Sequence, residues 1–455
     1  MVSTPTRPTK RTPSKPTAHP LTPLGRVRTW FSSFWEGVEG HDAAKNGSTY
    51  YLILGSTIAL TAIGIMMVLS ASSVEAIAQG QSPFAAAMKQ GVIAIAGFAV
   101  MFILSRVNVM WLKRLAWPGI IGSYVLLALV LVIGNSVNGN RNWIDIAGFS
   151  LQPSEAAKLA LALWMATVLA TKAKLLDRWM HVVIPVIPVA GGIIGLVLIG
   201  NDLGTGMIIM MIMAAALFFA GVPMRMFALA GVVLIIGTLA MALTSSNRMC
   251  RITSWWTGAA CGDGSDTNYQ STNGLGGLAS GGWFGVGLGQ SRQKYSWIPE
   301  AHNDFIFAII GEELGLIGAL VVVALFAILG ISIYRVVIRQ EDLFHRVLAG
   351  TIMVWILGQG TINMAVVTSL IPVIGVPLPF ISYGGSALLM SLAAIGVVLS
   401  LAREQMGASN KLKSPKFLKS AQTGSKNARP GTTKRVGIGS NKPNMVSRPS
   451  PRKRS

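Results

Sequence analysis

The chain has 455 residues, of which 52% are hydrophobic and 12% are charged, and its formal net charge is +21. About a quarter of the residues of an average soluble protein are charged, so this composition excludes that class. The positive charge does not indicate nucleic-acid binding, because it is divided among loops and tails around apolar segments, as in a membrane protein.

Apolar stretches recur along the chain, each long enough to cross a hydrocarbon core of about 30 Å as a helix. The sequence therefore predicts an all-α polytopic membrane protein with about ten transmembrane helices. The membrane domain is expected over residues 49–402, between an N-terminal tail, 1–48, and a C-terminal tail, 403–455. The predicted spans are residues 50–71, 88–105, 115–134, 153–171, 181–200, 203–221, 226–244, 305–334, 344–370 and 385–402.

Basic residues follow alternate spans, which predicts the orientation of the chain. They come after the second, fourth, sixth and eighth predicted spans, in loops on the same side as both tails. By the positive-inside rule that side is the cytoplasm. The loops at 72–87, 135–152, 245–304 and 371–384 are therefore expected to face outward, the largest between the seventh and eighth helices.

The two tails are predicted to be largely disordered. Residues 1–48 begin with a Thr, Pro, Lys and Arg tract, and the aromatic stretch from Trp30 to Val38 fits either an interfacial helix or a short linker. From Arg403 onward, fourteen Lys and Arg residues stand against one carboxylate, Glu404. Such a tail suits either attraction to membrane lipid headgroups or docking of an acidic cytoskeletal or division partner.

The first polar candidates lie around the start of the fourth span. Glu155 and Lys158 share one helix face because they are three residues apart. They form either an intramembrane ion pair or part of a polar cavity, in which Lys158 meets a diphosphate or a sugar. Upstream, Arg141 in the predicted outer loop supplies a guanidinium suited to a diphosphate.

Asp202 joins two spans through almost no loop, so we expect it to cap the sixth helix, with a secondary role in a cavity. In the long outer loop, a glycine-rich run from Gly274 to Gly289 allows close approach of the backbone to a ligand or a helix. Cys250 and Cys261 lie in the same loop and form either a disulfide or two free thiols. No cluster of metal ligands is evident in the sequence.

Three carboxylates lie at or inside the start of the eighth span. Asp304 stands where the outer loop becomes helix, so it is either an N-cap or a general base at the rim of a cavity. Glu312 and Glu313 follow eight and nine residues later, roughly 12 Å deeper at 1.5 Å per residue. At that depth they serve either as buried hydrogen-bonding groups or as charges that shape a cavity.

The run from Pro377 to Gly385, Pro-Leu-Pro-Phe-Ile-Ser-Tyr-Gly-Gly, precedes the last span. Its prolines interrupt helix, so irregular backbone is expected at or near membrane depth, where protein or water must satisfy its polar groups. Ser382 and Tyr383 either contact substrate in a cavity or belong to a turn that holds the last helix.

Four motifs resemble, in the same order, those of the shape, elongation, division and sporulation (SEDS) family of cell-wall polymerases, and its division branch most closely. They are Gln152-Pro-Ser-Glu155, Asp202-Leu-Gly204, the segment from Trp297 to Gly315, and the run from Pro377 to Gly385. The resemblance covers about residues 50–402. Two positions depart from the family pattern: Arg141 stands one residue early, and Gly200-Asn201 replaces Gln-Pro before Asp202.

The resemblance implies a peptidoglycan glycosyltransferase that polymerises lipid II, a lipid-diphosphate-linked disaccharide, at the outer face of the bacterial cytoplasmic membrane during septal synthesis. Asp304 matches the proposed catalytic aspartate of the family and would deprotonate the acceptor hydroxyl. Lys158 and Arg141 would then steady the diphosphate leaving group. Glu300 and His302 belong to the same motif as Asp304 and are candidates for substrate binding.

The resemblance also implies a class B penicillin-binding protein as a partner within the division complex. Some accounts of the family include a divalent cation, so Mg²⁺ is a candidate cofactor, although no ligand set for it is legible in this chain. Three alternatives stay open: an elongation-type polymerase, a lipid II flippase, which needs a path across the membrane, and a non-catalytic division scaffold, which would tolerate loss of Asp304.

Overall fold

The structure, a computed structural model, describes residues 46–78, 80–137, 140–146, 149–176, 178–225, 267–291 and 303–412, with a few single positions between 225 and 267. The chain divides into two units, Met1–Gly407 and Ala408–Ser455, and the packing described below is that of the first.

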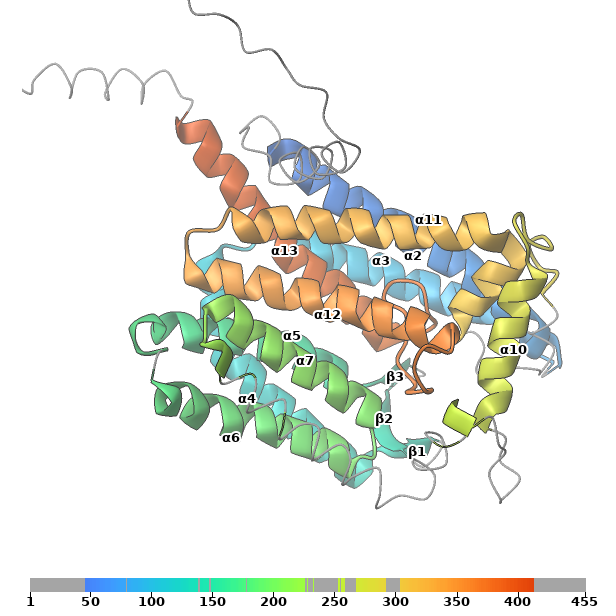
Figure 1. Ribbon diagram of the computed structural model, residues 1–455, viewed down its shortest axis with the longest axis horizontal. Helices are drawn as coiled ribbons and strands as arrows, with labels where there is room; N and C mark the ends of the chain where they lie inside the picture. The colour runs from blue at the N-terminus through green and yellow to red at the C-terminus, as the bar shows by residue number, and fades with distance from the viewer. Residues whose placement is uncertain are drawn as a thin grey trace, which may run out of the picture. The chain divides into compact units, whose positions relative to one another are not determined.

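Within the described ranges, nine helices are long and apolar enough to cross a membrane, which confirms the predicted all-α polytopic class. The seventh predicted span, 226–244, lies almost wholly outside the described residues, as do the chain before residue 46 and the chain after residue 412. The nine helices are α2 (Asn46–Ala78), α3 (Ala85–Arg106), α4 (Val109–Ile133), α5 (Pro153–Thr171), α6 (Trp179–Ile199), α7 (Leu203–Ala220), α11 (Ile306–Ile338), α12 (Leu343–Val367) and α13 (Gly385–Leu412) (Figure 1).

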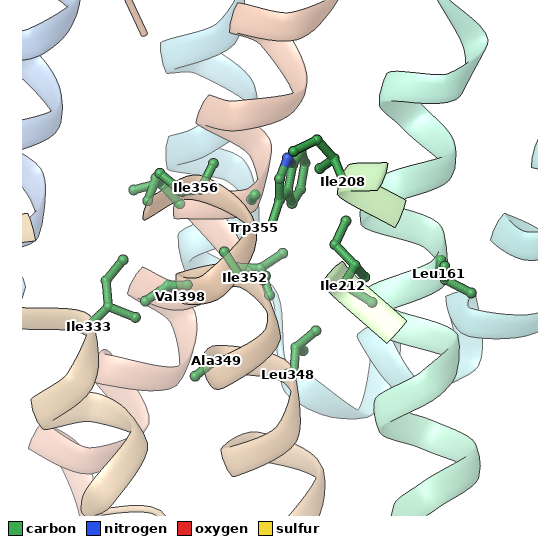
Figure 2. Close-up of a cluster of buried hydrophobic side chains, with 14 of the residues drawn as sticks. Leu161, Ile208, Ile212, Ile333, Leu348, Ala349, Ile352, Trp355, Ile356 and Val398 are labelled. Carbon is green, nitrogen blue, oxygen red and sulfur yellow. The ribbon is translucent and has the colours of Figure 1, made fainter. Parts of the chain in front are cut away.

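Helices α5, α7 and α12 pack against one another, and α11 joins them to α2 (Figure 1). Their facing sides are apolar around Trp355 of α12, which lies among Ile208, Ile356 and other buried aliphatic side chains (Figure 2). Small residues allow close contact between helices in a membrane. Gly350 of α12 faces the ring of Phe219 in α7 in this way.

Two structured segments stand at one end of the bundle, which we call the sheet end. Strands β1 (Asn135–Val137), β2 (Asn140–Ile146) and β3 (Phe149–Leu151) form an antiparallel sheet in that order between α4 and α5. Helix α10 (Thr267–Ser280) packs on α11 and α12 (Figure 1). The sequence predicted only outer loops over both segments.

Basic residues gather at the opposite end of the bundle, where the α3–α4 and α11–α12 connections meet. Lys113 lies 3.7 Å from the carboxylate of Asp342, which caps α12 by accepting a hydrogen bond from the Phe344 N–H. Arg403 of α13 donates to the carbonyl of Arg106 at 3.0 Å. The bundle therefore has one basic end and one end that carries the sheet, as the alternation of basic loops predicts.

Candidate functional site

A cavity of about 750 Å³ lies at the sheet end. Its wall is assembled from distant parts of the chain: the first turns of α3, strands β2 and β3, and the starts of α5, α7 and α13. Asp304 and the segment around Gly375 complete it. Four carboxylate residues contribute to this wall, namely Asp145, Glu155, Asp202 and Asp304.

Asp304 stands in the cavity wall two residues before α11 begins at Ile306. Phe305 takes the N-cap position of α11, so capping of that helix does not account for the aspartate. The carboxylate lies against Gly375, where a Cβ atom would be 3.5 Å from Oδ2. The main-chain carbonyl of Asp304 accepts a hydrogen bond of 2.8 Å from the Asn363 amide. A carboxylate presented to a cavity while its backbone is fixed is suited to act as a base.

Glu155 and Lys158 form the predicted ion pair, with 2.7 Å between Oε2 and Nζ and both side chains buried. Glu155 also lines the cavity, whereas Lys158 lies outside its wall. The Lys158 ammonium donates to Gln359 Oε1 at 3.1 Å and lies 5.2 Å from the centre of the Trp355 ring. A buried cation with three such partners stabilises the carboxylate in the wall.

Asp202 caps α7, as expected, and its side chain lies at the cavity. One carboxylate oxygen accepts a hydrogen bond from the Thr205 N–H at 2.9 Å and caps α7. The other accepts from the side-chain amide of Gln152 at 3.0 Å, which joins the start of α7 to the start of α5. The side chain also lines the cavity.

The cavity wall contains a cation that the sequence analysis passed over, Lys89 of α3. Arg141 is exposed, donates to the carbonyl of Leu131 at 3.0 Å and does not line the cavity. Lys89 influences Asp145, whose pKa is lowered mainly by hydrogen bonds from Ser150 and Asn135 and to a smaller degree by the lysine. Lys89 could have been found from the sequence, because it is a basic residue at the outward end of the predicted span 88–105, where basic residues are uncommon.

The chain between α12 and α13 is irregular, as its prolines predict. Ser369, Gly375 and Phe380 have φ values of 56°, 75° and 67°. Side chains of neighbouring elements satisfy its carbonyls: Gln359 donates to Pro377 O at 2.9 Å, and Trp255 to Ser369 O at 2.9 Å. Protein therefore covers this backbone, as is required at membrane depth.

Ser382 and Tyr383 differ in position although they are adjacent. The Ser382 hydroxyl is buried and accepts a hydrogen bond of 2.8 Å from the Leu378 N–H, so it closes the turn and does not line the cavity. Tyr383 is half-buried and lines the cavity. Burial raises the pKa of Tyr383, so its hydroxyl stays protonated at neutral pH and can donate to a ligand.

Glu312 and Glu313 lie outside the cavity wall and hold the glycine-rich segment 281–291 against α11. The Glu313 carboxylate accepts hydrogen bonds of 2.7 Å from Ser70 Oγ and 3.3 Å from the Ser291 N–H, and Glu312 accepts from Ser291 Oγ. The Val286 N–H donates to the carbonyl of Glu312 at 2.9 Å.

The glycines of this segment permit that close approach. Gly281 packs on the Gly311 carbonyl, and Gly285, with a φ of 80°, packs on the Glu313 carbonyl. A side chain at either position would overlap the helix backbone. Of the two partners that the sequence allows for this glycine-rich run, a ligand or a helix, the structure shows a helix.

Four predicted residues, Glu300, His302, Cys250 and Cys261, lie outside the described residues. Within the described ranges, no group of three or more His, Cys, Asp and Glu side chains is arranged to hold a metal ion. The donor set shown here therefore does not fit a divalent cation, and no chemical step is assigned to one.

Comparison with known proteins shows extensive similarity. The family model of cell cycle proteins named for FtsW, RodA and SpoVE matches residues 50–407. The probable peptidoglycan glycosyltransferase FtsW of Mycobacterium tuberculosis is 37% identical over 360 residues, which are 79% of this chain and 68% of the relative. The stage V sporulation protein E of Bacillus subtilis is 36% identical over 366 residues, 79% of this chain and 98% of the relative.

Solved structures agree with the sequence relatives. A chain from a study of the structural coordination of polymerization and crosslinking by a peptidoglycan synthase complex has a TM-score of 0.65 and 25% identity, covering 78% of this chain and 97% of its own length. The rod shape determining protein RodA of Thermus thermophilus has a TM-score of 0.58 and 26% identity, covering 78% and 96%. Because the family model matches most of the chain and relatives of 36–37% identity agree with it, the chain belongs to the FtsW, RodA and SpoVE family of membrane cell cycle proteins, the SEDS family.

Proposed function

We propose that the protein is a division-type peptidoglycan glycosyltransferase that polymerises lipid II at the outer face of the cytoplasmic membrane, at the septum. Its FtsW relatives carry the name peptidoglycan glycosyltransferase. The observation that carries the proposal is the position of Asp304 in the wall of a cavity that also contains Lys89. A carboxylate can serve as the base in glycosyl transfer from a lipid diphosphate, and an ammonium group can stabilise the leaving group.

In the proposed reaction, Asp304 takes the proton from the 4-hydroxyl of the acceptor N-acetylglucosamine. The freed oxygen attacks the anomeric carbon of the lipid-linked chain and forms the new glycosidic bond. The bond from that carbon to the diphosphate oxygen breaks with inversion, and the lipid diphosphate leaves with the electron pair. Lys89 stabilises the negative charge that develops on the leaving group.

This assignment moves the leaving-group role from Lys158 and Arg141 to Lys89. The Lys158 ammonium is already committed to Glu155 and Gln359, and Arg141 donates to a backbone carbonyl away from the cavity wall. We propose that Glu155 and Lys158 instead keep the wall in place, and that Asp202 and Tyr383 contact the sugars from α7 and from the start of α13.

We also propose a class B penicillin-binding protein as the partner, within the division complex. One structural relative comes from a peptidoglycan synthase complex that coordinates polymerization with crosslinking. A transpeptidase partner for this chain would crosslink the strands that it produces, so the two activities would work at one place.

The deciding experiment is lipid II polymerisation by the purified full-length protein with its cognate class B partner. We expect Asp304→Ala and Asp304→Asn to abolish glycan while folding and partner binding stay at wild-type levels. Thr361→Val, at an exposed position of α12, is the matched control and should retain polymerisation. Glycan made by both Asp304 variants would exclude the aspartate as the base and favour a scaffold function.

A further inference from the structure

One buried amide links the candidate base to the opposite segment of the cavity wall. Asn363, in α12, is 1% exposed. Its Nδ2 atom donates two hydrogen bonds of 2.8 Å, one to the carbonyl of Asp304 and one to the carbonyl of Val376. The two acceptors lie 59 and 13 residues from Asn363 along the chain. This one side chain therefore ties together two backbone segments that are far apart in the sequence.

The chemistry of asparagine suits this position. Two carbonyl oxygens that lie beside the same buried amide need donors, since a buried polar group left unsatisfied is costly. A primary amide supplies two N–H groups from one nitrogen, whereas aspartate, its isostere, supplies none when ionised. The other polar atom of this amide, Oδ1, has no hydrogen-bond partner among the described residues. The two N–H groups of Asn363, rather than its oxygen, therefore explain why an asparagine suits this position.

The two bonded carbonyls belong to the same part of the site. Gly375, next to Val376, lies against the Asp304 carboxylate, and both Asp304 and Gly375 line the cavity. Gly375 has a φ of 75°, which glycine adopts readily, so the chain can turn beside the carboxylate there. Holding Val376 to Asp304 thus sets how the carboxylate is presented to the cavity.

A second amide, one helical turn away, repeats the arrangement. Gln359 donates to Pro377 O at 2.9 Å and accepts from the ammonium of Lys158 at 3.1 Å. Gln359 and Asn363 are four residues apart and so lie on the same face of α12. Together they fix consecutive carbonyls of the irregular segment, those of Val376 and Pro377, on a rigid helix.

We propose that Asn363 is a positioning residue that holds Asp304 in its reactive orientation by tying its backbone to Val376. The inference rests on the proposed function, because it assigns Asn363 a role through the general base. Displacement of a reacting group by about 1 Å can lower turnover about 100-fold, so loss of the amide should act mainly on kcat.

The test compares Asn363→Ala and the near-isosteric Asn363→Asp with wild type, in the full-length protein bound to its partner, using lipid II polymerisation. We expect kcat to fall about 100-fold in both variants with KM within about threefold of wild type. We also expect the acid limb of the pH profile of kcat to move, because that limb reports the base in the substrate complex. Thr361→Val should change neither quantity.

Three outcomes would overturn the inference. The first is a wild-type kcat and acid limb in either folded variant. The second is a fall in activity that is fully explained by a smaller folded fraction, with the kcat per folded molecule unchanged. The third is failure of both variants to fold, which would assign Asn363 to stability alone. Glycan made by both Asp304→Ala and Asp304→Asn, in contrast, would refute the proposed base itself, so the two failures are distinguishable.

Discussion

At the residue scale, two lysines differ in their surroundings, and we therefore expect them to differ in function. Lys158 is 1% exposed and is held by an ion pair and a hydrogen bond. Lys89 is half-buried and lines the cavity. Lys158 is therefore expected to contribute to the stability of the fold, and Lys89 to the rate of glycosyl transfer.

We predict that Lys158→Met destabilises the protein by about 3–5 kcal/mol, because it leaves the buried Glu155 carboxylate without its counter-ion. The double variant with Glu155→Gln should recover a large part of this loss, since neither charge remains. Thermal unfolding of the purified protein in detergent measures both effects. Equal destabilisation by the single and double variants would show that the ion pair is not what Lys158 contributes.

Lys89→Ala is predicted to lower the rate of lipid II polymerisation per folded molecule about 100-fold, with the folded fraction measured separately by thermal unfolding. The reason is that an ammonium in the cavity wall stabilises charge that develops only in the transition state. Lys174→Ala, an exposed lysine in the connection between α5 and α6, is the control for general charge effects. Equal rates for Lys89→Ala and wild type would remove this residue from the mechanism.

At the element scale, short structured segments outside the long helices stand at the sheet end of the bundle, and the sheet β1–β3 contributes to the cavity wall. The sheet β1–β3 places Asp145 in the cavity wall, and the segment 281–291 is held to α11 by the Glu312 and Glu313 carboxylates. The sequence predicted these regions as outer loops because their apolar patterns are too short to stand out from turns. Their order depends on hydrogen bonds to distant elements.

The sheet should weaken in acid. Asp145 accepts hydrogen bonds from Ser150 Oγ at 2.5 Å and Asn135 Nδ2 at 2.7 Å, and these lower its pKa in the folded protein. A lowered folded pKa gives a stabilising contribution that is present above the unfolded value of about 3.9 and is lost as pH falls through the folded value.

Amide hydrogen exchange of β1–β3, corrected for intrinsic rates, measures this effect from about pH 6 to about pH 3. We expect protection to fall over the acid part of that range in wild type. Asp145→Asn should remove the pH dependence. An identical pH dependence in the variant would mean that another group controls the sheet.

At the scale of the whole molecule, the basic connections and the cavity lie at opposite ends of the helix bundle. The basic connections meet where Lys113 pairs with Asp342, whereas the cavity lies at the sheet end. Because basic loops are retained in the cytoplasm, the cavity is expected to face outward. A lipid-linked substrate presented at the outer face would then reach Asp304 from that side.

This orientation predicts a labelling pattern in intact cells. In a background where Cys250 and Cys261 are replaced by serine, Ser150→Cys at the exposed edge of the sheet should react with a membrane-impermeant maleimide. Lys174→Cys, in an exposed connection at the basic end, should react only after the cells are opened. The reverse pattern would invert the topology and place the cavity in the cytoplasm.

The sequence by itself determined the class of fold, the positions of the nine described spans and the family. Spans are legible because each must satisfy its own backbone hydrogen bonds and bury about 20 apolar residues, which is a local property of the chain. Asp304, Glu155 and Asp202 were found in the same way, since carboxylates beside apolar spans are conspicuous, and all three line the cavity.

Only the tertiary structure decided which polar groups share the cavity. Glu312, Glu313 and Lys158 lie in segments that the sequence marks as polar sites, yet each is turned to a partner from another element. Lys89 and Asn363 were not singled out from the sequence, yet Lys89 lines the cavity and Asn363 bonds the Asp304 carbonyl. The reason is physical. A buried charge or amide needs a hydrogen-bonding or ionic partner, but only the packing of distant helices determines which group becomes that partner.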